Sequence, residues 1–192
     1  MTTVDATAPA IALEEVEAPP WAIRAEQPLD LDLIHDLHRA AFRRPEEAEL
    51  VDAIRSGPDF IPELSLVAAT DDGSVLGHVL VSRVTFQPDG DGEARRDALA
   101  LAPLAVLPPH WGRGIGSALV RAVLPTADAR EEPFIAVLGS PQFYGRFGFT
   151  AASDFGIRSP YDDAGDAFQV RPRGGESLPP GTISYPPMFG SV

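Results

Sequence analysis

Residues 104–120 read Leu-Ala-Val-Leu-Pro-Pro-His-Trp-Gly-Arg-Gly-Ile-Gly-Ser-Ala-Leu-Val. The first part continues an apolar run from Ala98 to Leu107, which predicts a buried strand. A glycine-rich turn from Gly112 to Gly116 follows, and the apolar residues Ile115 and Leu119 then indicate the start of a helix. The first amides of a helix lack internal partners, and glycines let a phosphate approach them closely. This stretch therefore predicts a site for a phosphate-bearing ligand.

The glycine spacing excludes two common phosphate-binding motifs. A P-loop needs Lys and then Ser or Thr directly after its last glycine, whereas Ser117 and Ala118 follow Gly116. The dinucleotide-binding fingerprint is Gly-x-Gly-x-x-Gly, whereas here every second residue from Gly112 to Gly116 is a glycine. The phosphate is therefore bound in neither of these two ways.

Composition indicates one domain in a chain of 192 residues. Residues 1–20 are rich in Ala, Pro and Glu without an apolar period, so we expect a disordered acidic tail before a domain at residues 21–192. The chain has no cysteine, which excludes disulfides, thiolate metal sites and a cysteine nucleophile.

The net charge of −13 argues against nucleic acid as a partner. An acidic surface suits a cationic amine, although it also serves plain solubility. There is no apolar run of membrane-spanning length and no signal-peptide pattern, so we expect a cytoplasmic protein with no membrane partner. The acidic residues show no metal-ligand spacing, and no metal is expected.

Periodicity predicts a mixed order of strands and helices, and by itself indicates only a mixed α/β domain. Strands are expected at 21–26, 64–70, 75–86, 98–107, 134–138, 167–171 and 182–185. Helices are expected from Asp30 or Asp32, from Pro45 to Gly57, from Gly114 to about Leu124, and at 142–147. Pro125 should end or kink the third helix. The strand at 182–185 could pair across a two-fold axis in a homodimer.

Two motifs resemble a known family. Val106-Leu107-Pro108 followed by Gly114-Ile115-Gly116 resembles the acetyl-CoA motif of the GNAT superfamily of N-acetyltransferases. The segment from Tyr144 to Phe149, Tyr-Gly-Arg-Phe-Gly-Phe, resembles a second segment of that family. Trp111 departs from the family pattern, which has Gln or Arg there.

The resemblance is closest to the YhbS-like group within that superfamily and covers about Trp21 to Gly190. Further shared segments are Ser65–Ala68, Gly77-His78, Leu101–Val106 and Tyr185-Pro186-Pro187. The resemblance implies an α/β fold with a mostly antiparallel central sheet, splayed parallel fourth and fifth strands, and flanking helices. It also implies an acyltransferase that moves an acetyl group from acetyl-CoA to a primary amine of a small molecule or protein by direct attack.

The resemblance further implies which residues bind the cosubstrate. These are Leu104, Ala105, Val106, Trp111, Gly112, Arg113, Gly114, Ile115, Gly116 and Ser117. The Val106 amide is the expected donor to the oxyanion, although Val106 would also fit as a plain buried strand residue. Arg113 either adds a charged contact or is a solvated surface residue.

Tyr144 is the expected general acid, because a phenol with a pKa of ~10 can protonate a thiolate whose thiol has a pKa of ~8.5. The alternative is a core tyrosine packed on the fifth strand. For the general base the sequence offers His78, His110, Glu63 and Asp154, and selects none of them.

Two other readings of the chain stay open: a non-catalytic acyl-CoA-binding sensor on the same fold, and a structural domain. Tyr144 favours the enzyme, because a sensor needs no proton donor. We expect the acceptor pocket to be built from the first two helices, the loop at 87–96 and the C-terminal strands.

Overall fold

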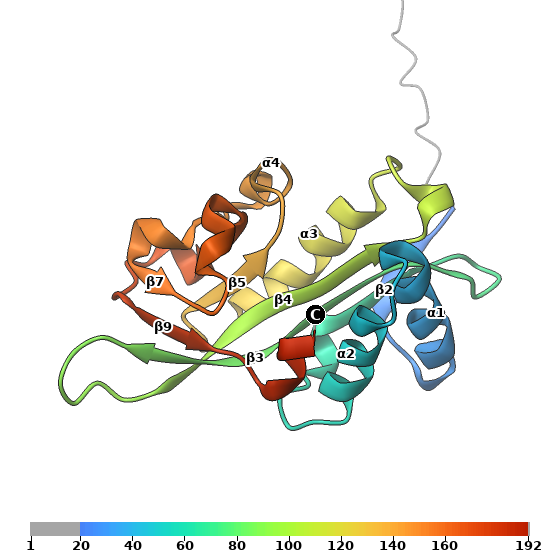
Figure 1. Cartoon of the computed structure of the whole chain (residues 1–192). Helices are drawn as coiled ribbons and strands as arrows, with labels where there is room; N and C mark the ends of the chain where they lie inside the picture. Colours follow the sequence, from blue (N-terminus) through green and yellow to red (C-terminus); the bar gives the residue numbers. More distant parts are fainter. Residues whose placement is uncertain (1–19, 192) are drawn as a thin grey trace, which may run out of the picture.

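The computed structural model describes residues 20–191. The predicted tail therefore lies outside the described residues, except for Pro20. One nine-stranded sheet runs in the order β1-β2-β3-β4-β5-β8-β6, and β9 pairs with β3 and β7 (Figure 1). β4 and β5 are parallel, while the other neighbours along the main order are antiparallel. This mixed sheet with flanking helices confirms the predicted fold class.

The elements follow the predicted order closely. The strands are β1 Ala22–Ala25, β2 Ser65–Ala69, β3 Val75–Pro88, β4 Arg96–Val106, β5 Phe134–Leu138, β6 Thr150–Ala151, β7 Ile157–Arg158, β8 Phe168–Pro172 and β9 Gly181–Ser184. The α-helices are α1 Leu31–Phe42, α2 Glu46–Arg55, α3 Ile115–Asp128 and α4 Pro141–Tyr144. Short 3-10 turns connect several of them.

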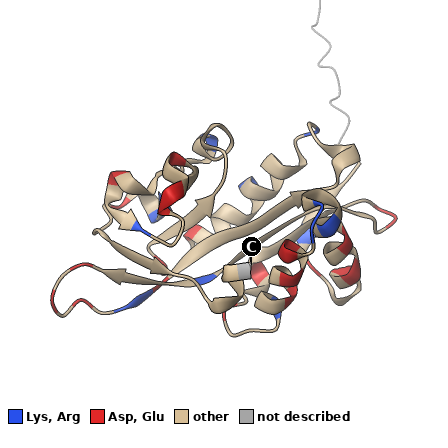
Figure 2. Cartoon of the chain, in the orientation of Figure 1, with Lys and Arg blue, Asp and Glu red and all other residues tan. Residues whose placement is uncertain are grey.

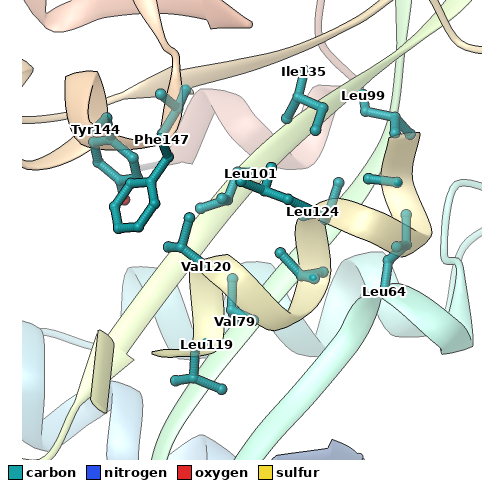
Figure 3. Close-up of a cluster of buried hydrophobic side chains, with 14 of the residues drawn as sticks. Leu64, Val79, Leu99, Leu101, Leu119, Val120, Leu124, Ile135, Tyr144 and Phe147 are labelled. Atoms are coloured by element: carbon teal, nitrogen blue, oxygen red, sulfur yellow. The ribbon is translucent and has the colours of Figure 1, made fainter. Parts of the chain in front are cut away.

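The helices cover the two faces of the sheet separately. α3 packs through Ile115, Leu119 and Val123 against one face, in a cluster that also contains Val79 and Leu101 (Figure 3). α1 and α2 pack against the other face in a second cluster, built from residues such as Ile34, Leu37, Leu50, Val51, Leu80 and Ala105. The alternation of side chains along β3 and β4 supplies both faces from the same strands.

β4 and β5 pair over a short distance and then diverge. Their register runs from Leu99–Ile135 to Leu101–Val137 and ends there, although both strands continue. The β3–β4 ladder is also interrupted at this level, by a register shift between Val79 and Val81. Pro103 in β4 has no N–H to donate to a ladder, which accounts for the break. The divergence leaves a gap between β4 and β5 beyond the Leu101–Val137 pair.

The structure corrects the predicted end of the third helix. α3 continues through Pro125 to Asp128. Leu124 and Ala127 are buried, so their packing favours the continued helix. Pro125 itself is exposed, which leaves the carbonyl group it cannot bond accessible to water.

Three smaller expectations are also revised. β6 and β7, of two residues each, were not expected, because they are too short for a periodic signal. Asp30 precedes α1 as expected but makes no cap; its carboxylate instead accepts hydrogen bonds from Arg24 and the Gln27 amide. β9 pairs with β3 and, through Gly181 and Thr182, with β7. This strand is therefore largely paired within the chain, and the homodimer stays a prediction.

Acidic residues are spread over separate parts of the molecule. Figure 2 shows them along α1 and α2 and on the segment between β7 and β8, whereas α3 carries few charges. In the described part of the chain, no helix has the length and apolar character needed to cross a bilayer.

Candidate active site

The glycine-rich turn forms an open helix start. Gly112 and Gly114 have φ values of 77° and 82°, a region that favours glycine. The Ala118 amide donates to the Gly114 carbonyl at 3.0 Å and is the first amide bonded within the helix. The three amides from Ile115 to Ser117 come before it, so they are available to an anion.

Close packing joins this turn to the end of β4. A Cβ on Gly116 would lie 3.6 Å from Val106 Cγ2, 3.7 Å from Phe143 Cζ and 3.9 Å from Leu104 Cδ2. Gly77 in β3 lets α3 approach the sheet, because a Cβ there would lie only 2.8 Å from Ile115 Cγ2. Gly77 therefore marks a position where α3 approaches β3 closely.

Val106 turns its backbone polar groups away from β3. The Leu107 amide donates to the Leu76 carbonyl of β3 at 2.9 Å. Because backbone groups alternate along an antiparallel strand, the N–H and C=O of the preceding residue, Val106, point to the opposite side. On that side β4 has no strand partner beyond Leu101. The Val106 N–H thus faces the divergence of β4 and β5.

Trp111 has a structural role that the sequence did not reveal. Its indole Nε1 donates to the Val106 carbonyl at 2.6 Å, although the residue is 56% exposed. This bond occupies the carbonyl that the end of the ladder leaves open. It also ties the glycine-rich turn to the last residue of β4.

Tyr144 lies on the other side of the divergence, at the end of α4. Its ring is buried beside Phe143 and Phe149, at centroid distances of 4.8 and 5.7 Å, and near Phe147 (Figure 3). Its hydroxyl makes no hydrogen bond with any described residue, and burial raises the pKa of this phenol well above its usual value. Gly139 gives the ring its space, since a Cβ there would collide with it. Tyr144 is thus a protonated donor that has no hydrogen-bond partner among residues 20–191.

A cavity of about 340 Å³ fills the divergence. Leu101 and Leu104 from β4, Val137 from β5, and Gly139 and Tyr144 line it on one side. On the other side its walls come from α1, α2 and the C-terminal segment. The loop at 87–96, which was expected to contribute to the acceptor pocket, does not line this cavity. The loop follows the far end of β3, away from the divergence.

Two further residues that were predicted to bind the cosubstrate, Arg113 and Ala105, lie in different surroundings. Arg113 is exposed next to the turn and makes no side-chain hydrogen bond with any residue from 20 to 191. Ala105 is buried on the α1–α2 side.

Arg146 is a cation near the turn that the sequence did not single out. Its guanidinium lies over Phe143, 4.9 Å from the ring centroid, and 3.4 Å from the Ser117 hydroxyl. Only its place in the Tyr144–Phe149 motif hinted at a role.

None of the four candidate bases lines the cavity. Glu63 and Asp154 are exposed, and His110 lies in the short 3-10 turn after β4. His78 is fully buried under α1. It belongs to a buried polar network, formed by Glu26, Ser65, His78 and His38.

The hydrogen bonds of this network fix its proton positions. The Ser65 hydroxyl donates to Glu26 at 2.5 Å, so its oxygen accepts from His78 Nε2 at 2.9 Å. His78 Nδ1 therefore accepts, and His38 Nε2 donates to it at 2.8 Å. His38 Nδ1 is left as an acceptor with no partner among the described residues.

Charge in the network is confined to one end. Burial would raise the pKa of Glu26, but the neighbouring His78 ring and hydrogen bonds from Arg55 and Ser65 lower it to about 2. Burial lowers the pKa of His78 below its usual value although Glu26 opposes this, and burial lowers that of His38 well below it. Both histidines are neutral at pH 7, while Glu26 pairs with Arg55 at 2.8 Å.

A larger cavity, of about 710 Å³, lies at the C-terminal end of α3. It contains Arg83, Arg96, Arg130 and Arg173, but each of them pairs with a carboxylate, as Arg130 does with Glu132 at 3.0 Å. It therefore offers no unpaired cation among residues 20–191. In the same range, no group of three or more potential metal-ligating side chains is placed to hold a metal ion.

The class of protein follows from its similarity to known proteins. The sequence profile of the acetyltransferase (GNAT) family matches residues 31–149. The chain belongs to this family, and it is an acyltransferase.

Individual relatives agree. The uncharacterized N-acetyltransferase YhbS of Escherichia coli K12 is 36% identical over 148 residues, which cover 77% of this chain and 84% of the relative. The uncharacterized N-acetyltransferase YjhQ of the same strain is 34% identical over 133 residues, 69% of this chain and 71% of the relative.

Two solved structures resemble the fold at more than 30% identity. The complex of E. coli YhbS with CoA superposes with a TM-score of 0.79 at 32% identity, covering 90% of this chain and 93% of that one. A GNAT family acetyltransferase from Brucella melitensis in complex with acetyl-CoA gives a TM-score of 0.70 at 33% identity, covering 88% and 97%.

Proposed function

We propose that this protein transfers an acetyl group from acetyl-CoA to a primary amine by direct attack. The observation that carries the proposal is that Gly116, the end of β4 and the Phe143–Tyr144 pair lie together. One end of this site offers amides for a pyrophosphate, and the other offers a phenol for a departing thiolate. The two similar structures that hold CoA and acetyl-CoA support the same cosubstrate here.

Each group has a distinct task in the proposed reaction. The amides from Ile115 to Ser117 hold the pyrophosphate, with Arg146 as a nearby cation. The Val106 N–H donates to the thioester oxygen as it becomes an oxyanion. The neutral amine forms its bond to the carbonyl carbon, and the bond from carbon to sulfur breaks. Tyr144 protonates the leaving thiolate, and the proton that the nitrogen loses returns to the tyrosinate, which restores the phenol.

The decisive experiment combines calorimetry with CoA and a thiol-release assay. We expect CoA to bind, and acetyl-CoA to release free thiol only when an amine acceptor is present. Binding without thiol release from any acceptor would favour the non-catalytic sensor. Absence of CoA binding would overturn both readings and leave a structural domain.

A further inference from the structure

We propose that the acceptor is a small monoamine with an apolar alkyl or aryl body. It binds against an aromatic acceptor wall, formed by Phe42, Tyr161, Tyr185 and Phe189 on the side of the cavity away from the cosubstrate turn. This inference rests on the proposed function, because it names the acceptor for the same reaction.

The acceptor wall is preorganised. Tyr161 and Tyr185 meet edge to face at 5.1 Å, and Tyr185 and Phe189 lie 5.1 Å apart at a tilt of 52°. The Tyr161 hydroxyl donates to the Phe189 carbonyl at 3.2 Å, which fixes the last turn of the chain against the wall. These rings offer a large apolar surface against which the alkyl or aryl body of an acceptor can pack.

The charges around the cavity cancel. Arg44 and Glu47 are the charged side chains that line it among the described residues, and the Arg44 Nε donates to both Glu47 oxygens, at 2.9 and 3.0 Å. An acceptor with a carboxylate or a second ammonium group would bury a charge for which the cavity has no partner, and this is costly. The wall therefore discriminates against amino acids and polyamines.

Size and polarity favour a small molecule over a protein acceptor. A volume of about 340 Å³ is small for a ligand site, and it must also admit the acetyl end of the cosubstrate. A lysine side chain would bring backbone amides to the mouth of the cavity, where aromatic rings offer them few hydrogen-bond partners.

Most of the acceptor wall lies outside the family match. That match ends at residue 149, whereas Tyr161, Tyr185 and Phe189 come later in the chain. The family profile therefore does not account for these rings, although Tyr185 lies in the segment that resembles the YhbS-like group.

The test measures thiol release at saturating acetyl-CoA with a panel of acceptors. 2-Phenylethylamine and hexylamine represent the proposed class, phenylalanine adds a carboxylate to the same aryl body, spermidine adds further amines, and a lysine peptide represents proteins. We expect kcat/KM for the two monoamines to exceed that for each of the other acceptors by at least about tenfold. Phenylalanine, spermidine and the lysine peptide must each desolvate a polar group that the cavity leaves unpaired.

Two variants on α1 test whether the acceptor wall binds the acceptor. Phe42→Ala should raise the KM for 2-phenylethylamine about tenfold by removing one ring of the wall, and leave the KM for acetyl-CoA unchanged. Leu33→Ala is the matched control, because Leu33 is 44% exposed on the same helix and does not line the cavity.

The possible failures are distinguishable. Thiol release that is faster with spermidine, phenylalanine or the lysine peptide would overturn this inference and leave the proposed function intact. Equal changes in both variants would also overturn it. Absence of thiol release with every acceptor would overturn the proposed function and, with it, this inference.

Discussion

Two buried regions of this protein use polar side chains in opposite ways. In the buried polar network under α1, each polar group except His38 Nδ1 has a partner, and the chain of hydrogen bonds fixes both histidine rings. In the cavity between β4 and β5, the Tyr144 hydroxyl has none among the described residues. A buried polar group that is satisfied internally contributes to the fold, whereas one left without a partner is available to a ligand. Burial alone therefore does not separate a structural residue from a catalytic one.

The largest expected effect comes from neutralising Glu26. Glu26→Gln would leave the Arg55 guanidinium, which is 14% exposed, without its main partner. We expect the free energy of unfolding to fall by about 3 kcal/mol. Urea denaturation measures this change, and exposed Glu63→Gln serves as the control. A lower kcat in variant protein that is still folded would contradict the contrast between the two regions, because it would show that the buried polar network contributes to catalysis.

Tyr144→Phe should show the opposite pattern. We expect kcat to fall about 100-fold through loss of the proton donor, while the free energy of unfolding changes by less than about 1 kcal/mol. Because burial raises the pKa of this phenol, the decrease should persist at pH 9. Thiol release under saturating substrates measures it, and Tyr161→Phe is the control phenol. An unchanged kcat would assign Tyr144 to the core.

The network should also make stability depend on pH. His38 and His78 are kept neutral in the fold, whereas in the unfolded chain they protonate as the pH falls below about 6.5. The unfolded state then binds more protons, so stability falls toward acid by up to about 1.4 kcal/mol per pH unit for each histidine. Denaturation midpoints between pH 7 and pH 5 measure the slope.

Replacing one histidine sharpens that prediction. His38→Asn should reduce the slope by up to half, whatever its effect on stability at pH 7, whereas His110→Asn should leave it unchanged. Equal slopes in all three proteins would show that the histidines of the network are not the titrating groups.

The smallest effect concerns the tie between Trp111 and Val106. Trp111→Phe keeps an aromatic ring but removes the donor at 2.6 Å. Without this hydrogen bond, which contributes about 1 kcal/mol, the end of β4 should be less well ordered. We therefore expect the KM for acetyl-CoA to rise about fivefold, without a change in global stability. Trp21→Phe, which changes the other tryptophan, is the control. An equal KM in both variants would make the tie irrelevant to cosubstrate binding.

Much of the fold could be predicted from the sequence. Strong periodicity placed the seven longer strands and the main helices, and the glycine pattern placed the turn before α3. The end of α3 predicted at Pro125 was wrong. The hydrogen bond that proline cannot make on an exposed helix face costs less free energy than the burial of Leu124 and Ala127 contributes. The strands at 150–151 and 157–158 are too short for any period.

The site was predictable only in part. Motif spacing indicated the glycine-rich turn, Val106 and Tyr144, but it could not show that Trp111 bonds to Val106, because that contact depends on the path of the turn. The sequence indicated that the first two helices and the C-terminal strands contribute to the acceptor pocket, but it could not name the rings of the acceptor wall, for a similar reason. Its rings lie far apart in the sequence, and only the return of β9 to β3 brings Tyr185 and Phe189 to the cavity.

The pairing of β9 with β3 also bears on synthesis. A ribosome completes the glycine-rich turn and Tyr144 well before it reaches Phe189. A nascent chain can therefore assemble the cosubstrate half of the cavity first, while the acceptor wall waits for the last turns to leave the exit tunnel. A product that is cut short after Pro172 would lack Tyr185 and Phe189, and with them the part of the cavity that the proposed acceptor contacts.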